Sequence, residues 1–117
     1  MDDAKPVVFR GSSLADLRDF PQPAKNEAGY QLHQIQHGQD ADDWKPMKTI
    51  GPGANEIRIR DSSGAFRVIY VAKFMDVIYV LHCFQKKSQR TSQMDIHLAQ
   101  TRYKDLLKEL KIKELNV

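Results

Sequence analysis

The chain has 117 residues, of which 41% are apolar and 28% are charged, a composition typical of one small globular domain. Its longest apolar run, VIYVLHCF, is interrupted by His82 and is too short to span a membrane. The acidic start MDDAKPVVFRG lacks the apolar core of a signal peptide. The lone Cys83 excludes an intrachain disulfide and fits a reducing compartment. We therefore expect one domain over residues 1–117 that is cytoplasmic and has no membrane partner.

Charge is distributed unevenly along the chain. Residues 1–44 hold four Lys/Arg and eight Asp/Glu, a balance of −4, whereas residues 45–117 hold fourteen and seven, a balance of +7. Such asymmetry bears on partners rather than on fold, and a basic half suits an anionic partner such as a nucleic acid. A solvated surface with scattered charges is the alternative, and charge alone does not separate the two.

The N-terminal third predicts a short strand followed by two helices. The apolar run at residues 7–9 is the expected strand, and a short helix begins at Ser12 or Ser13. A second helix is expected from Pro23 to about His37, because proline is favoured in the first turn and a glycine follows as the C-terminal cap.

The middle and the C-terminal part predict a loop, three strands and a helix. Residues 38–55 contain three glycines and two prolines and read as a loop, in which Trp44 either stacks on a base or anchors the core. The strand-like segments NEIRIRD, AFRVIYVAKF and VIYVLHCFQKK follow, and the short turns between them predict consecutive antiparallel strands. Ser92 and Asp95 resemble a capping box for a last helix. That helix has a continuous apolar stripe of Met94, Leu98, Tyr103, Leu106, Leu107 and Leu110.

Cations recur along the predicted strands. Alternation places Glu56, Arg58 and Arg60 on one face of their strand. Arg67 lies among aliphatic neighbours in the next strand, where partial desolvation strengthens it as an anion ligand. The alternative for Arg67 is a structural ion pair with Glu56 or Asp61.

The last strand ends in further candidate groups. Lys86 and Lys87 stand at its end, where a lysine crowded by cations contacts phosphate or loses its proton and acts as a base. A solvated strand end is the alternative. His82, on the same face as Lys86, is either a proton shuttle or a satisfied core residue.

The sequence gives little support for a metal-binding site. His33 and His37 stand four residues apart on the second predicted helix, but a third ligand is missing and Gln34 occupies the place of the glutamate in an HExxH motif. Cys83 reads as a small buried hydrophobe. We expect no metal and no cofactor.

Several motifs occur together in a diagnostic order: WKPMK, a glycine-bearing loop, EIRI, FRVIY, LHCFQKKSQ, and an A-x-x-R-Y helix at Ala99, Arg102 and Tyr103. This set resembles the RelE/HigB superfamily of toxins from bacterial toxin–antitoxin systems, in particular its phage-derived host-inhibition-like branch, over nearly the whole chain. The resemblance implies an α+β fold. It would be a compact RelE-like domain with N-terminal helices packed on one side of a mainly antiparallel sheet and a C-terminal helix.

The resemblance also implies an activity. Members of the superfamily are endoribonucleases that cleave mRNA, usually on the ribosome, without a metal: the ribose 2′-OH attacks the adjacent phosphate and leaves a cyclic phosphate and a free 5′-OH. Translation and growth stop, and a small antitoxin, here expected to carry a helix-turn-helix, neutralises the toxin. The alternatives are an RNA- or ribosome-binding protein that does not cleave and a phage accessory protein.

Site residues follow from the same resemblance. Arg67 matches the arginine expected to stabilise charge on the phosphate, Arg58 assists it, and Lys86 of the F-x-K-K motif is the candidate acid or base. The C-terminal tyrosine of some relatives has no clear counterpart, since Tyr103 is expected in the core. RNA contacts are expected from Lys45, Lys48, Arg60 and Lys87, with Lys48 as an alternative base.

Overall fold

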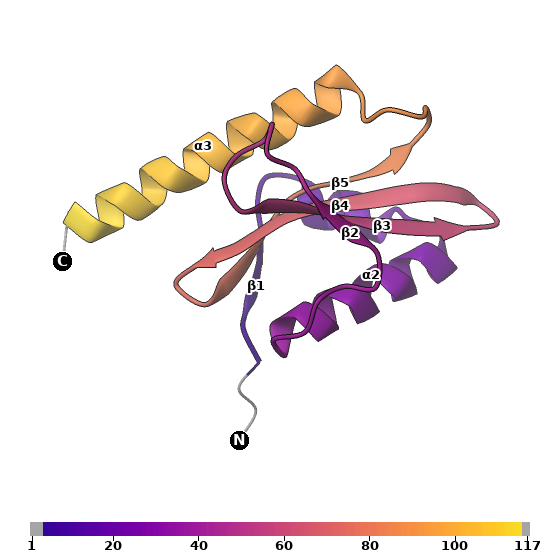
Figure 1. Ribbon diagram of the computed structural model, residues 1–117, viewed down its shortest axis with the longest axis horizontal. Coiled ribbons are helices and arrows are strands. Elements are labelled where there is room, and N and C mark those ends of the chain that lie inside the picture. The colour runs from indigo at the N-terminus through magenta and orange to yellow at the C-terminus, as the bar shows by residue number, and fades with distance from the viewer. Residues whose placement is uncertain (1–3, 116–117) are drawn as a thin grey trace.

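The computed structural model describes residues 4–115 of the chain (Figure 1). A five-stranded sheet lies between helices on both of its faces. The elements are, in chain order, β1 (Val7–Phe9), α1 (Ser13–Arg18), α2 (Gln22–Gln36), β2 (Trp44–Pro46), β3 (Ala54–Asp61), β4 (Gly64–Phe74), β5 (Val77–Lys86) and α3 (Gln93–Leu115).

The strands are ordered β1-β5-β4-β3-β2 across the sheet. β2, β3, β4 and β5 pair antiparallel, so the predicted arrangement of the three long strands is confirmed. β1 pairs parallel with β5, from Val7 opposite Ile78 to Phe9 opposite Val80. Met75 and Asp76 both take positive φ in the turn between β4 and β5, which makes that connection tight.

One strand lies inside the segment that the sequence predicts as a loop. Trp44, Lys45 and Pro46 form β2 and pair with β3. The strand is three residues long and ends in proline, which is tolerated because β2 is an edge strand. Trp44 is 37% exposed there, so of the two possibilities for this residue, the one in which it anchors the core is wrong.

Two apolar cores hold the layers together. Leu17 of α1, Leu32 of α2 and Phe20 between the two helices pack on one face of the sheet, against strand residues that include Ile57 and Val68. Ala99, Tyr103 and Leu106 of α3 pack on the opposite face. Figure 1 shows α2 and α3 on opposite sides of the strands. The α+β fold with the N-terminal helices on one side is therefore confirmed.

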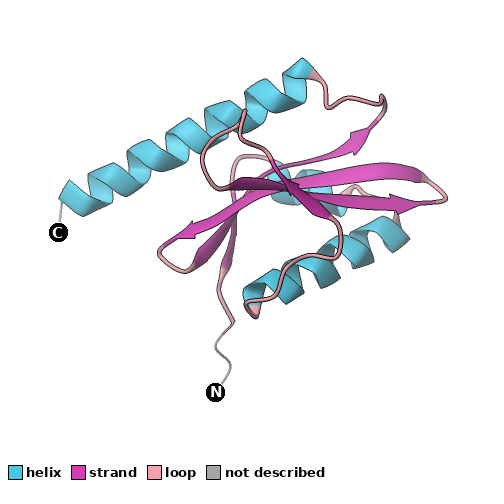
Figure 2. Cartoon of the chain, in the orientation of Figure 1, coloured by secondary structure: helices cyan, strands magenta, loops and turns pink. Residues whose placement is uncertain are grey.

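α3 touches the sheet over only part of its length. The backbone N–H of Asp95 donates to Ser92 Oγ at 3.1 Å, which confirms the predicted cap. The apolar stripe is only partly right, because Met94, Leu98 and Leu107 are exposed. The loop between β2 and β3 lies against the helix (Figure 2), where Tyr103 donates to the carbonyl of Pro52 at 2.5 Å. No helix within the described residues is long and apolar enough to cross a membrane.

Candidate nucleic-acid interface

Strand register gathers most of the predicted cations on the face of the sheet that carries α3. Residues paired across neighbouring strands share a face, and Arg58 is paired with Arg67 and Arg60 with Ala65. On the next strand Phe84 stands opposite Arg67 and Lys86 stands opposite Ala65. α3 covers the apolar part of this face, and the cations occupy the part beyond its N-terminus.

Two adjoining hollows open on this basic part of the face. The first, of about 460 Å³, is lined by Arg60, Arg67, Lys86 and Lys87 together with Ala65, Ser88 and Gln89. The second, of about 310 Å³, is lined by Arg58, Arg60 and Arg67 with Asp43 and Ile59. Arg60 and Arg67 border both hollows, so five of the seven predicted site residues form one continuous surface.

Arg67 lies at the floor of both hollows and is 5% exposed. Its Nε is 3.4 Å from Oε1 of Glu56, a carboxylate with no exposed surface, and its Nη1 donates to the carbonyl of Phe66 at 3.0 Å. The ion pair with Glu56 that the sequence left open is thus present. Burial lowers the pKa of Arg67 from its ordinary value, with repulsion from Arg58 adding to the effect and attraction to Glu56 opposing it.

Glu56 connects further groups to this centre. Lys45 Nζ lies 4.0 Å from Glu56 Oε1, and Thr91 Oγ1 donates to Oε2 at 3.2 Å. The carboxylate therefore lies between a cation of β2, a cation of β4 and the segment before α3. Arg67 is its only buried cationic partner among these groups, and removing Arg67 would leave the buried carboxylate charge without a desolvated partner.

Arg58 is held by Asp43, the residue just before β2. Its Nε donates to Asp43 Oδ1 at 2.9 Å, and its Nη2 lies 2.8 Å from the same oxygen. The backbone N–H of Arg58 also donates to the carbonyl of Asp43 at 2.8 Å. The guanidinium is 40% exposed, so it remains available to an anion above the sheet.

Lys86 has a lowered pKa. Partial desolvation is the largest cause, repulsion from Arg67 comes next, and the nearby Glu56 acts in the opposite direction. An amine with a lowered pKa gives up its proton at a pH closer to neutrality, which suits a proton-transfer role. Lys48 does not line either hollow; it is exposed in the loop after β2, and its predicted role stays a prediction.

Beside the cations, His82 Nε2 lies 2.7 Å from Asp95 Oδ1, and its ring stacks on Phe84 with a centroid distance of 4.9 Å. His82 is 5% exposed, in keeping with the core residue that the sequence offered as one of two possibilities. Three partners in this region were missed from the sequence: Asp43, Thr91 and Asp95 as a partner of His82. Each contacts a residue on a different element, a kind of contact that periodicity does not indicate.

His33 and His37 stack edge to face at 4.3 Å between ring centroids. In the described part of the chain no three His, Cys, Asp or Glu side chains are grouped closely enough to hold a metal ion. Cys83 is buried, and its burial raises the pKa of the thiol to about 12, so it is not a thiolate nucleophile near neutral pH.

Comparison with known proteins agrees with the fold. A family model described as phage-derived Gp49-like protein matches residues 15–104. Among solved structures, a double arginine-to-alanine mutant of E. coli toxin RelE in the free state is similar, with a TM-score of 0.58 at 16% identity over 74% of this chain and 87% of that chain. No functionally curated protein matches the sequence. The chain thus belongs to the Gp49-like family of phage-derived proteins and has a RelE-like fold.

Proposed function

We propose that the protein is the toxin of a toxin–antitoxin system and that it is a metal-independent endoribonuclease. In this proposal it cleaves mRNA on the ribosome in the cytoplasm, stops translation and growth, and is neutralised by a helix-turn-helix antitoxin. The whole of residues 1–117 acts as one unit. The resemblance to the RelE/HigB superfamily and the RelE-like fold support the class of protein.

One observation connects the proposed activity with the basic surface of the sheet. Arg60, Arg67, Lys86 and Lys87 line a single hollow on the open part of the sheet. Converging cations suit a phosphate with its two flanking nucleotides, and a partly desolvated site strengthens their attraction to the charge that develops during cleavage.

The chemistry needs three tasks. A base removes the proton of the ribose 2′-OH, whose oxygen then bonds to phosphorus; cations stabilise the extra negative charge; an acid protonates the departing 5′-oxygen as its bond to phosphorus breaks. We assign charge stabilisation to Arg67 with Arg58, and proton transfer to Lys86, whose lowered pKa favours it. Lys45, Arg60 and Lys87 contact the RNA backbone, and Lys48 is the alternative base.

A second function uses the same surface without catalysis. The ion pair between Arg67 and Glu56 is also what a structural role would show, and a protein that only binds RNA or the ribosome needs the same exposed cations. A short neighbouring reading frame for a helix-turn-helix protein would favour the toxin over this alternative and over a phage accessory protein.

Arg67→Ala separates cleavage from binding. If Arg67 stabilises the transition state, single-turnover cleavage of mRNA on purified ribosomes slows by about 10²–10³-fold, the loss that follows removal of one preorganised donor. Ribosome affinity falls far less, because one contact is a small part of a surface with many cations. Arg67→Lys restores little, since an ammonium does not reproduce the planar fork of a guanidinium.

Two controls make the result decisive. Circular dichroism establishes that the variants fold, because Arg67 is buried against Glu56. Chelator treatment of the isolated protein before assay in defined magnesium leaves the rate unchanged if no protein-bound metal takes part. Equal losses in rate and affinity would assign Arg67 to binding, and absence of cleavage by the unmodified chain would reject the nuclease.

A further inference from the structure

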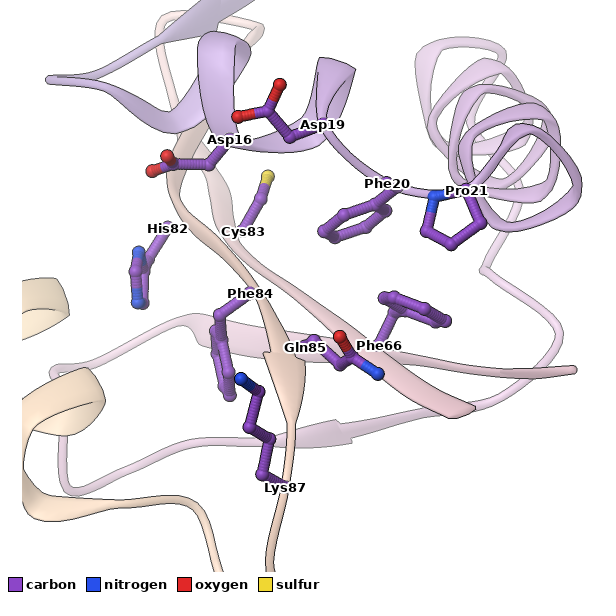
Figure 3. A pocket seen from close by; sticks show the side chains of 10 residues that line it. All are labelled: Asp16, Asp19, Phe20, Pro21, Phe66, His82, Cys83, Phe84, Gln85 and Lys87. Carbon is purple, nitrogen blue, oxygen red and sulfur yellow. The ribbon is translucent and has the colours of Figure 1, made fainter. Parts of the chain in front are cut away.

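A third hollow, of about 380 Å³, lies at the edge of the sheet beside α1 and shares Lys87 with the first hollow (Figure 3). β1 stops pairing with β5 at Val80, so the rest of β5 borders this hollow from the side. Phe20, Phe66 and Phe84 provide its aromatic wall, and Phe20 and Phe66 lie 4.8 Å apart between ring centroids. Side chains of both sheet faces meet here, because the hollow straddles the edge.

The rim beside α1 is acidic. Asp16 and Asp19 both line the hollow, and in Figure 3 their carboxylates lie at one end, near His82 and Cys83, while Lys87 lies at the other end. Ser12 Oγ donates to Asp16 Oδ2 at 2.8 Å, which fixes that carboxylate. Both aspartates belong to the acidic segment 1–44, so this rim differs in charge from the basic part of the sheet.

A buried ring nitrogen of His82 is a second, independent sign that a ligand binds in this hollow. His82 is 5% exposed and lines the hollow, and its Nδ1 has no hydrogen-bond partner among the described residues. Nε2 is engaged with the carboxylate of Asp95, which only accepts, so Nε2 carries the proton and Nδ1 of the neutral ring is an acceptor. A buried acceptor without a donor is costly, and an N–H group entering the hollow would satisfy it.

Gln85 adds one more acceptor. Its Nε2 donates to the carbonyl of Ser63 at 3.3 Å, which leaves Oε1 as the amide atom available for the hollow. Two carboxylates, a ring nitrogen and an amide oxygen thus border the hollow together with the aromatic rings. Acceptors and ring faces together are the environment in which proteins bind organic cations.

We propose that this hollow binds the guanidinium group of an arginine that a partner polypeptide inserts at the edge of the sheet. A guanidinium is planar, stacks on an aromatic ring and offers five N–H donors, which suits rings bordered by several acceptors better than the compact ammonium of lysine does. The site shares only Lys87 with the hollow of about 460 Å³ on the proposed RNA surface, and the inference goes beyond the proposed nuclease activity. Lys87 borders it from the end opposite the aspartates and weakens the binding of a cation by repulsion.

The test uses the full-length ¹⁵N-labelled protein and two short blocked peptides, Gly-Arg-Gly and the same peptide with citrulline, which has the shape of arginine without its charge. We expect the arginine peptide to shift the NMR signals of Asp19, Cys83 and Gln85 with a Kd of about 1 mM, and the citrulline peptide to bind at least about tenfold more weakly.

Single substitutions show which side chains of the hollow bind the arginine peptide. Asp19→Asn weakens binding of the arginine peptide about fivefold, the factor that corresponds to losing one exposed ion pair, whereas Lys87→Ala strengthens it. Asp76→Asn, which removes the same charge at the other end of β5, leaves the affinity unchanged. Asp19 is chosen over Asp16 because it accepts no bond from Ser12, so α1 is left intact.

Other results would overturn the proposal. Equal binding of the citrulline peptide, an unchanged affinity in Asp19→Asn, or shifts centred on Arg67 would each exclude a guanidinium site in this hollow. Tighter binding of free arginine than of the peptide would indicate a small-molecule site and reject a polypeptide partner. None of these readouts depends on RNA cleavage, so failure of the proposed nuclease and failure of this site are distinguishable.

Discussion

At the scale of single residues, the basic face is organised by one buried carboxylate. Glu56 has no exposed surface, yet it stands between Arg67, Lys45 and Thr91. Removing its buried partner Arg67 costs about 3–5 kcal/mol, because the carboxylate charge then stays buried without compensation. Glu56 and Arg67 also shift the pKa of Lys86 in opposite directions, so the buried ion pair influences the lysine at the end of β5.

Opposite shifts of the Lys86 pKa are expected from two substitutions. Arg67 lowers the pKa of Lys86 by repelling its charged form, so Arg67→Ala should raise it. Glu56 raises the pKa by attracting the charged form, so Glu56→Gln should lower it further. NMR titration of the Lys86 ammonium measures both directions without any assay of RNA cleavage.

The pH dependence of the cleavage rate shows whether Lys86 acts as the base or as the acid. If Lys86 acts as the base, the cleavage rate rises as the pH passes upward through the lowered pKa, because only the neutral amine accepts a proton. Arg67→Ala would then move this rise to higher pH. A rate that falls over the same interval would identify Lys86 as the acid instead, and movement of the Lys86 pKa in the same direction in both variants would contradict the electrostatic account.

At the scale of elements, sequence patterns predicted what is local. β3, β4 and β5 alternate or run apolar over many residues and are joined by short turns, so their existence and antiparallel order could be predicted. β2 was missed because three residues ending in Pro46 show no periodicity. The parallel pairing of β1 with β5 and the contacts Asp43–Arg58 and His82–Asp95 join distant segments, and no local signal identifies such partners.

α3 illustrates the limit in a helix. Its stripe of apolar residues predicts a buried face along the whole helix. Among the side chains that the structure describes, Ala99, Tyr103 and Leu106 of that face are buried, while Met94 and Leu98 are exposed. This buried stretch, from Ala99 to Leu106, is about two turns long. Amphipathicity predicts which side of a helix faces a core but not how far that core extends.

Two glycines should respond in opposite ways to alanine. A Cβ at Gly51 would lie 2.8 Å from the Tyr103 ring, so Gly51→Ala forces the loop off α3 and lowers the free energy of unfolding by about 1–3 kcal/mol. Gly29 lies inside α2, and a methyl group added there would have nothing within 4 Å, so Gly29→Ala raises the free energy of unfolding by roughly 0.5–1 kcal/mol. Urea unfolding measures both, and stabilisation by Gly51→Ala would contradict the described contact.

At the scale of the whole molecule, charge and layering are related. The acidic segment 1–44 contributes α1 and α2 on one face, and the basic remainder contributes the open part of the opposite face. The charge asymmetry of the sequence therefore becomes an asymmetry between two sides of the sheet. A polyanion that approaches the molecule is attracted to one side only, which orients it before contact.

Salt dependence should report this orientation. For a single-stranded RNA oligonucleotide, the logarithm of the association constant falls linearly with the logarithm of salt concentration, and Lys87→Ala reduces the slope by about one unit. Lys25→Ala, on α2 behind the sheet, leaves the slope unchanged although it removes the same charge. Fluorescence anisotropy at several salt concentrations measures the slopes, and equal changes in both variants would show that the basic face is not the binding surface.

The parallel pairing of β1 with β5 has a consequence for the order in which the molecule assembles. β1 precedes its partner β5 by about seventy residues in the chain, and α3, which packs on the same sheet, follows β5. Pairings between such distant segments form slowly, because the intervening chain must be closed into a loop first. β1 therefore has no strand partner until residues 78–80 have been synthesised, and the sheet cannot be completed from the N-terminal segments alone.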